Sequence, residues 1–172
     1  RVTREVQTYT AASDVPSLPE DVAGAVVHIG GLQPYRHARK HLHSHIQVAP
    51  QAAGLQPATA NAPPYLVPEI LKAYDGDGLG LSGKGQAIAI LIDTIPLDTD
   101  LTAFWAANNV AGSLARITRI NVKGGALPAP SGEETLDVEW ASTIAPDANV
   151  RIYASGTLAF IDLDRALDRI YA

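Results

Sequence analysis

Short apolar runs alternate with amphipathic stretches along the second half of the chain. Residues 87–92 read Ala-Ile-Ala-Ile-Leu-Ile, a continuous apolar run that is typical of a buried parallel strand. Two shorter runs predict further strands at residues 117–122 and 150–154. Helical spacing predicts helices around them, at residues 68–74, 98–108, 133–145 and 160–171. This alternation of strand and helix predicts an α/β sandwich with a mainly parallel sheet.

For the predicted helix over residues 98–108, the sequence indicates both the capping residue and the side chains that face the core. Asp98 or Thr99 is expected to cap its amino end, because short polar side chains accept hydrogen bonds from free backbone N–H groups. Leu101, Phe104 and Trp105 are expected to pack inward. The helix over residues 133–145 is expected to end near Pro146, because proline cannot continue a helix.

The first third of the chain has a different character. Residues 1–10 are rich in β-formers and predict a strand. A short helix is expected to open at Leu18-Pro19-Glu20-Asp21, to run through Val27, and to be followed by Gly30-Gly31. Residues 33–64 contain five prolines and little apolar periodicity, which is typical of a linker. We therefore divide the chain into residues 1–35, a linker at 36–62, and a second domain at 63–172.

Composition narrows the class of protein. With 172 residues, 47% apolar residues and a mean hydropathy of +0.04, the chain has the composition of a packed globular protein. A formal charge of −5 argues against nucleic acid or an anionic membrane as the main partner. No apolar run reaches the roughly 18 residues of a membrane helix, and no signal peptide is recognisable.

Two residue types are missing. Without cysteine, this stretch has neither disulfides nor thiolate chemistry. The chain starts at Arg1 and contains no methionine, so we expect a processed product or a piece of a longer one.

The acidic stretch Ser131-Gly-Glu-Glu-Thr-Leu-Asp-Val-Glu-Trp140 carries the candidate chemistry. Glu133 and Asp137 are four residues apart, so a helix places both carboxylates on one face. Like charges this close resist ionising together, so one carboxyl should keep its proton to higher pH, as in paired acid/base devices. The alternative is a solvated acidic face at the start of a helix, where carboxylates suit the helix dipole.

Further residues are candidates for a functional site beside this pair. Asp93 follows the apolar strand, at the end of a strand where α/β sheets place active sites. His37, His41, His43 and His45 could hold a metal, but interleaved Arg and Lys favour a solvated basic linker or a pH-responsive segment. Asp75 and Asp77 look like half of a calcium loop without its later ligands, so a turn is expected there. The glycines at 76–85 precede the strand, which is the wrong order for a phosphate-binding dinucleotide fold.

Several of these segments together resemble one enzyme family. Pro68-Glu-Ile-Leu-Lys-Ala-Tyr74, Gly83-Lys-Gly-Gln-Ala-Ile-Ala-Ile90 and Gly132-Glu-Glu-Thr-Leu-Asp-Val-Glu139 with Ala145-Pro146 look like the start of a sedolisin (serine-carboxyl peptidase) catalytic domain, closest to the kumamolisin branch. Residues 1–9 and 18–32 resemble the last strand and helix of that family's activation prodomain.

The resemblance implies a fold and an activity. The fold would be a subtilisin-like three-layer sandwich, present in part over residues 63–172, preceded at 1–35 by the tail of an α+β prodomain and at 36–62 by an activation linker where maturation cuts. The enzyme would be a secreted acid endopeptidase with a Ser-Glu-Asp triad, made as a zymogen. Glu133 would be the general base and acid, and Asp137 the residue that orients and tunes it.

The same resemblance implies what lies elsewhere. The nucleophilic Gly-Thr-Ser-Ala motif, the oxyanion-stabilising Asp and the calcium loop come later in the family's sequence, and none of the serines here stands in that context. No cofactor or metal is therefore expected in this segment. The expected partners are a protein or peptide substrate and the remainder of the catalytic domain, possibly as a second chain, with no nucleic acid and no membrane.

One departure and two alternatives stand beside this interpretation. Some relatives carry a further Glu at the end of the first strand, where Ile92 stands here with Asp93 next to it. The first alternative is a non-catalytic binding module on the same scaffold. The second is a subtilase-like hydrolase that uses Asp93.

Overall fold

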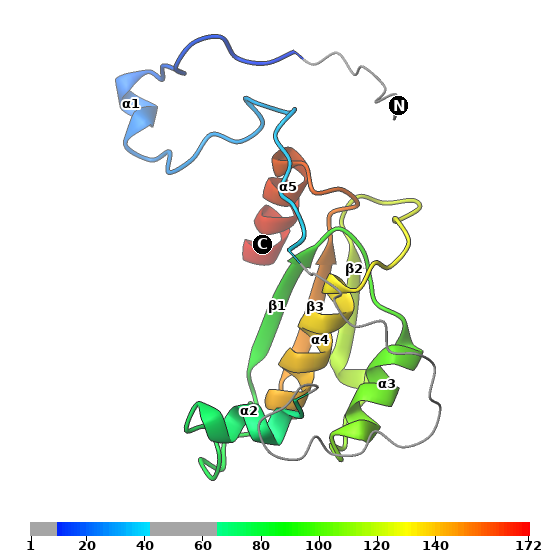
Figure 1. Cartoon of the computed structure of the whole chain (residues 1–172). Helices are drawn as coiled ribbons and strands as arrows, with labels where there is room; N and C mark the ends of the chain where they lie inside the picture. Colours follow the sequence, from blue (N-terminus) through cyan, green and yellow to red (C-terminus); the bar gives the residue numbers. More distant parts are fainter. Residues whose placement is uncertain (1–9, 42–64) are drawn as a thin grey trace.

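The computed structural model describes residues 10–41 and 65–172. These ranges contain three strands and five α-helices (Figure 1). The strands are β1 (Ala87–Ile92), β2 (Ile117–Asn121) and β3 (Asn149–Ala154), and a 3-10 turn at Leu114–Arg116 precedes β2. The helices are α1 (Glu20–Ala23), α2 (Val67–Ala73), α3 (Asp98–Ala107), α4 (Glu133–Ile144) and α5 (Phe160–Tyr171).

The three strands form one parallel sheet in the order β1-β3-β2. Ile90 of β1 is in register with Ile152 of β3, and Ile117 of β2 with Val150. The predictions of a mixed α/β fold and a parallel sheet are confirmed. The carboxyl ends of all three strands lie at one edge of the sheet, and α4 begins near that edge (Figure 1). Ligands of open α/β sheets usually bind at this edge.

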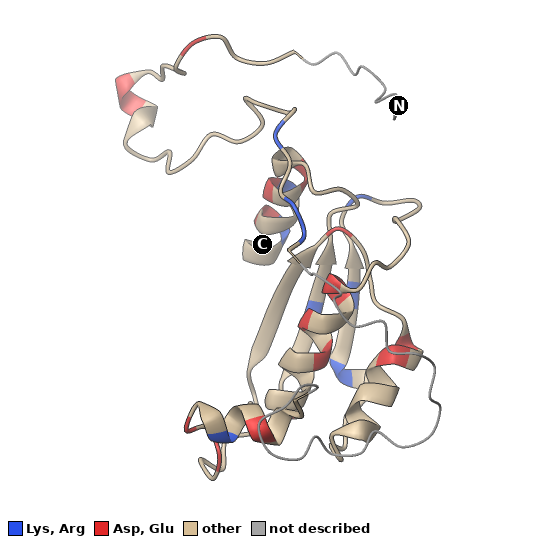
Figure 2. Cartoon of the chain, viewed as in Figure 1, with Lys and Arg blue, Asp and Glu red and all other residues tan. Residues whose placement is uncertain are grey.

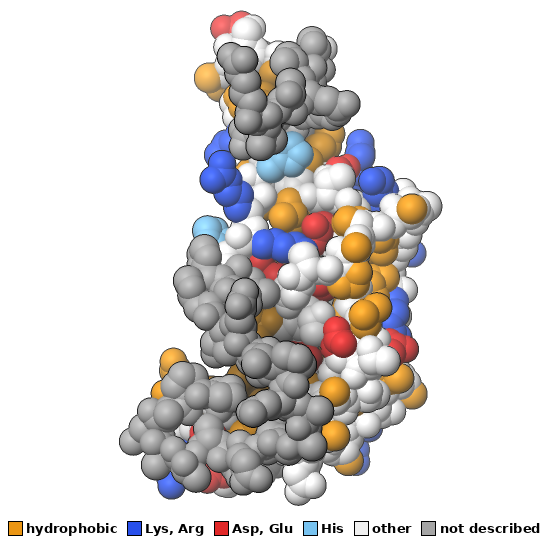
Figure 3. All heavy atoms as spheres, turned by 45° about the vertical axis from the view of Figure 1, so that its right-hand side comes forward, with side chains coloured by type: hydrophobic (Ala, Val, Ile, Leu, Met, Phe, Trp, Pro, Cys, Tyr) orange, Lys and Arg blue, Asp and Glu red, His pale blue; other side chains and the backbone are white. Residues whose placement is uncertain are grey.

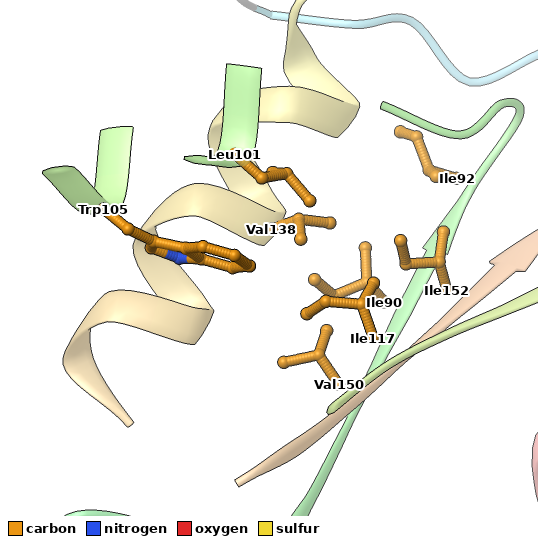
Figure 4. Close-up of a cluster of buried hydrophobic side chains, with 8 residues drawn as sticks. All are labelled: Ile90, Ile92, Leu101, Trp105, Ile117, Val138, Val150 and Ile152. Carbon is orange, nitrogen blue, oxygen red and sulfur yellow. The ribbon is translucent and has the colours of Figure 1, made fainter. Parts of the chain in front are cut away.

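The hydrophobic core lies between the sheet and the two helices α3 and α4 (Figure 4). Its members are fully or nearly fully buried side chains: Ile90, Ile92, Leu101, Trp105, Ile117, Val138, Val150 and Ile152. The run at 87–92 forms a strand with the expected bounds, yet only Ile90 and Ile92 are buried. β1 is an edge strand among the described strands, so its amino end is not enclosed as a central strand would be. Helix α5 contacts β1 and β3 without contributing to this cluster.

Trp105 fixes the position of α3 against α4. Its indole Nε1 donates a hydrogen bond of 2.8 Å to Ser142 Oγ on α4, so the one polar atom of this buried ring is satisfied. A Cβ at Gly112 would lie 2.0 Å from the indole, so the loop after α3 can pass this closely only at a glycine. Leu101 and Trp105 are buried as predicted, whereas Phe104 is half-buried and tilts against the Trp140 ring.

The predicted cap of α3 is wrong. Leu97 precedes the helix and provides no side-chain hydrogen bond, and neither Asp98 nor Thr99 caps the helix. Asp98 instead lies inside the first turn and forms an ion pair with Arg119 of β2. The carboxylate still lies at the positive end of the helix dipole, so its charge stabilises the helix without a capping bond.

Two of the motifs that carry the family resemblance contact each other. The turn at Gly83 leads into β1, and the turn at Ala145 follows α4. Asp147 N donates to Ser82 O at 2.9 Å, and a Cβ at Gly83 would lie 2.8 Å from that of Ala145. Gly83 also has φ +75°, which an L side chain rarely adopts. Glycine is therefore needed where the two turns meet.

The amino-terminal region differs from its prediction. The helix α1 spans four residues, Glu20–Ala23, and does not run through Val27. None of its residues is buried, and residues 10–27 lie away from the sheet (Figure 1). A helix without a packed face has little to stabilise more than one turn. The predicted strand at 1–10 lies almost entirely outside the described residues.

The chain reaches the sheet domain through residues 36–38. Ala38 N donates to Leu158 O at 2.7 Å, and Phe160 N donates to Arg36 O at 3.1 Å. These bonds form an antiparallel bridge in front of α5. Most of the predicted linker at 36–62 lies outside the described residues, so the division of the chain into domains stays a prediction. In the part of the chain that is described, no helix is long and apolar enough to cross a membrane.

Candidate functional site

The acidic segment forms α4, as its spacing predicts. The helix begins after Gly132, whose φ of 116° is in a region that favours glycine. Glu133 is the first residue of the helix and Asp137 lies one turn further on the same face. Figure 2 shows acidic residues along α4 and basic residues in the segment that passes beside α5. The structure thus brings the two predicted carboxylates together at the carboxyl edge of the sheet.

Glu133 is half-buried and contacts the first part of the predicted linker. Its Oε2 accepts a hydrogen bond of 3.0 Å from the backbone N–H of His41. A carboxylate oxygen in this position is engaged by the chain itself.

Asp137 lies on the wall of a groove between β1 and α4. The groove has a volume of about 820 Å³, and Leu91, Leu136 and Trp140 are among its other lining residues. Among the described residues that line it, Asp137 is the only one with an ionisable side chain. The groove is open, so its wall combines a carboxyl group with apolar surface that a bound chain segment can cover.

The pKa of Asp137 is raised above its usual value. The largest cause is partial desolvation by the surrounding protein, which acts even though the side chain is exposed. The negative charge of Glu133 is the next cause. The charge of Glu134 also raises this pKa, whereas Lys40 lowers it. Asp137 therefore holds its proton more strongly than a free aspartate, as the spacing of the pair predicts.

Glu134, between the two, has a structural role. Its side chain is fully buried, and its Oε1 accepts hydrogen bonds from the backbone N–H groups of Ser131 (2.5 Å) and Gly132 (2.7 Å). Burial alone would raise the pKa of Glu134, but these backbone bonds and the contact with Lys40 outweigh it and lower the pKa to about 2. Glu134 is therefore ionised at mildly acidic and at neutral pH.

Lys40 joins Glu134 to Asp93. Its Nζ lies 2.9 Å from Glu134 Oε2 and 2.8 Å from Asp93 Oδ1, and only 19% of its side chain is exposed. Burial disfavours the charge of Lys40, but the two carboxylates outweigh this effect and raise its pKa. In Figure 3, acidic and basic side chains gather near the middle of one face of the molecule. Asp93 and Glu134 are 41 residues apart in the sequence, and Lys40 links them from a third segment.

The titration of Asp137 is expected to follow its charged neighbours. Glu133→Gln removes a negative charge and should lower the pKa of Asp137, whereas Lys40→Met removes a positive charge and should raise it. The carboxyl ¹³C shift of Asp137, followed by NMR against pH, measures both changes. Asp147→Asn, beyond the far end of α4, is the control and should leave the Asp137 curve in place. An Asp137 curve that is the same in all four proteins would show that the two carboxyls are not coupled.

The other candidates do not form a site in the described residues. His37 and His41 contact the rest of the protein through their backbones, and His43 and His45 lie outside the described ranges. Asp75 and Asp77 lie in the turn after α2, as expected. In the described ranges, no group of three or more His, Cys, Asp or Glu side chains is arranged to hold a metal ion. Asp93 accepts no hydrogen bond from a histidine within those ranges.

Comparison with protein-family models, with curated proteins and with solved structures found no match to this chain. The sedolisin resemblance and the subtilisin-like arrangement therefore stay predictions.

Three residues of the site were not predicted from the sequence. Ser131 and Glu134 have the Ser-x-x-Glu spacing of a helix capping box. The structure forms the half of this motif in which the backbone N–H of Ser131 donates to the Glu134 carboxylate, whereas Gly132 is the N-cap and no side chain caps the helix. Lys40 has no such local signal. Glu139, on the same helix, is a fourth unpredicted group at some distance from these: burial, and next the charge of Asp100, raise its pKa to about 7.

Proposed function

We propose that this chain is part of an acid-acting serine-carboxyl endopeptidase of the sedolisin type, to which it supplies the glutamate and aspartate of the triad. The observation that carries the proposal is the position of Asp137. It lies one helical turn from Glu133 at the wall of an open groove, and its pKa is raised in part by that neighbour. A carboxylate pair of this kind can take up and release a proton at acidic pH.

In this proposal Glu133 is the general base and Asp137 orients it. The Glu133 carboxylate accepts the proton of a serine hydroxyl while the serine oxygen attacks the scissile carbonyl carbon. It then returns the proton to the amine leaving group, and a water molecule hydrolyses the acyl-enzyme through the same group. The serine would come from a part of the protein outside these 172 residues, as the resemblance implies.

Ser131 does not take that part. Its Oγ accepts a hydrogen bond of 2.7 Å from Lys40 Nζ, and the raised pKa of Lys40 keeps this nitrogen protonated. A protonated ammonium cannot remove the hydroxyl proton. The Ser131 hydroxyl donates a long hydrogen bond of 3.5 Å to Glu134 Oε2, but the pKa of Glu134 is lowered to about 2, so this carboxylate is a weak base for the hydroxyl proton.

The contacts of residues 36–41 support a zymogen. This segment engages Glu133 through His41 N and lowers the pKa of Asp137 through Lys40. It is the first part of the predicted activation linker at 36–62. In the proposed enzyme, which would be secreted and would take calcium outside this segment, maturation in the linker allows these contacts to be released.

The experiment is an assay of the full-length gene product on an unfolded protein substrate, after incubation at about pH 4 and at pH 7. Hydrolysis at the acidic pH, with a new amino terminus within residues 36–62, is expected. Hydrolysis only at neutral pH and abolished by Asp93→Asn would favour the subtilase-like alternative. A folded product without activity at either pH would favour the binding module.

A further inference from the structure

The ammonium group of Lys40 lies among three oxygen atoms. Its Nζ lies 2.8 Å from Asp93 Oδ1, 2.9 Å from Glu134 Oε2 and 2.7 Å from Ser131 Oγ. Ser131 Oγ and Glu134 Oε2 accept hydrogen bonds from this group, and Asp93 Oδ1 forms an ion pair with it. They come from the end of β1, the start of α4 and the loop before α4, and Lys40 itself comes from a fourth segment.

The Glu134 carboxylate is held in place by bonds that do not involve Lys40. Its side chain is fully buried, and its Oε1 accepts hydrogen bonds from the backbone N–H groups of Ser131 and Gly132. Its Oε2 faces Lys40 and accepts a long hydrogen bond of 3.5 Å from Ser131 Oγ. Asp93 Oδ1 is also buried and accepts no hydrogen bond within the described ranges, so the ion pair with Lys40 is its polar contact there. Both oxygens contact the same nitrogen and so lie within about 6 Å of each other, where two negative charges repel without a cation between them.

We propose that Asp93, Ser131 and Glu134 form a binding site for a primary ammonium group, which Lys40 occupies from within the chain and which takes a lysine side chain of a peptide substrate once residues 36–41 have left. The second half of this proposal rests on the proposed function. Three converging oxygens suit the compact ammonium of lysine, whereas the planar guanidinium of arginine is best matched by two parallel acceptors.

The contact made by the chain itself places this site next to the candidate catalytic pair. Lys40 fills the site, and the N–H of the next residue, His41, donates to Glu133. A peptide bound in the same way would place the residue after its lysine at Glu133. Asp93 and Glu134 are therefore expected to determine specificity, while Glu133 acts on the reacting atoms and Asp137 orients Glu133.

The ammonium site can be tested in the chain itself by chemical rescue. Lys40→Ala removes three methylene carbons and the ammonium, which are the atoms that n-propylammonium supplies. Added n-propylammonium chloride should raise the Tm of Lys40→Ala by about 2–4 °C more than tetramethylammonium chloride at the same concentration, because only the former has N–H donors. This difference should disappear in Lys40→Ala/Glu134→Gln and, if that variant does not fold, in Lys40→Ala/Asp93→Asn. Equal effects of the two salts on Lys40→Ala, or an undiminished difference in a folded double variant, would overturn the site.

The role in substrate specificity is tested with the mature full-length enzyme and two peptides. One peptide has lysine and the other norleucine at the position that precedes the residue expected at Glu133. The lysine peptide should have a kcat/KM about tenfold higher or more, and Asp93→Asn should reduce this ratio towards one. Equal cleavage of both peptides would overturn the role in specificity. An enzyme that cleaves neither peptide would count against the proposed function, and the rescue experiment would still decide whether the ammonium site exists.

Discussion

Glu133→Gln is expected to lower kcat/KM of the full-length gene product at acidic pH by about 10³-fold, with most of the loss in kcat. An amide cannot accept the proton of an attacking serine, whereas it keeps the size of the side chain and can still accept the hydrogen bond from His41 N. Asp137→Asn should lower kcat as well, because the amide neither shares a proton with Glu133 nor influences its charge.

Steady-state kinetics on a peptide substrate measures these effects, with Asp168→Asn as the matched control. Asp168 is an exposed carboxylate on α5, so the Asp168→Asn variant should retain the wild-type kcat/KM. A circular dichroism spectrum shows whether each variant is folded. If folded Glu133→Gln kept the wild-type kcat/KM, Glu133 could not be the general base.

Glu134→Ala is expected to destabilise the chain by about 3 kcal/mol at pH 7. The substitution leaves the backbone N–H groups of Ser131 and Gly132 without their acceptor and leaves Lys40 with one carboxylate fewer. Thr135→Ala, on the same turn of α4, is the control and should change the free energy of unfolding by less than about 0.5 kcal/mol. Urea denaturation of the three proteins measures the difference.

The stability that comes from the charge of Glu134 should decrease as the pH falls. Its pKa falls from 4.5 to about 2 on folding, so the folded state favours the ionised form. This contribution is present in full above pH 4.5 and is lost as the pH falls through about 2. The difference between wild type and Glu134→Gln should shrink from about 3 kcal/mol at pH 7 to about 1 kcal/mol at pH 3. A difference that grew on acidification would show that the carboxyl group is protonated in the folded state.

The sequence was sufficient to predict the elements that make the sheet and its flanking helices. The run at 87–92 has the bounds of β1, and the acidic stretch forms α4 from Glu133, because local periodicity reports which face of an element is buried. The short helix α1 was overestimated for the same reason. Pro19 and the acids after it indicated a helix through Val27, but none of the residues of α1 is buried, so no packing stabilises a longer helix.

The candidate site was predictable only where its residues are close in sequence. The spacing of Glu133 and Asp137 predicted their shared face, and the strand before Asp93 predicted an acid at the edge of the sheet. The link through Lys40 was not predictable, because it depends on how a distant segment crosses that edge. Lys40 stands among several basic residues, and nothing in the local sequence distinguishes it from a solvated lysine.

The pH dependence of kcat/KM for the full-length gene product tests the role of the Glu133 and Asp137 pair most directly. A pair that must share a proton predicts activity that is highest at acidic pH and falls as the pH rises towards neutrality and both carboxyls ionise. In Asp137→Asn the remaining activity should lose this dependence over the same range. Activity that rises towards neutral pH, or an acidic profile that is the same in wild type and Asp137→Asn, would contradict the proposal.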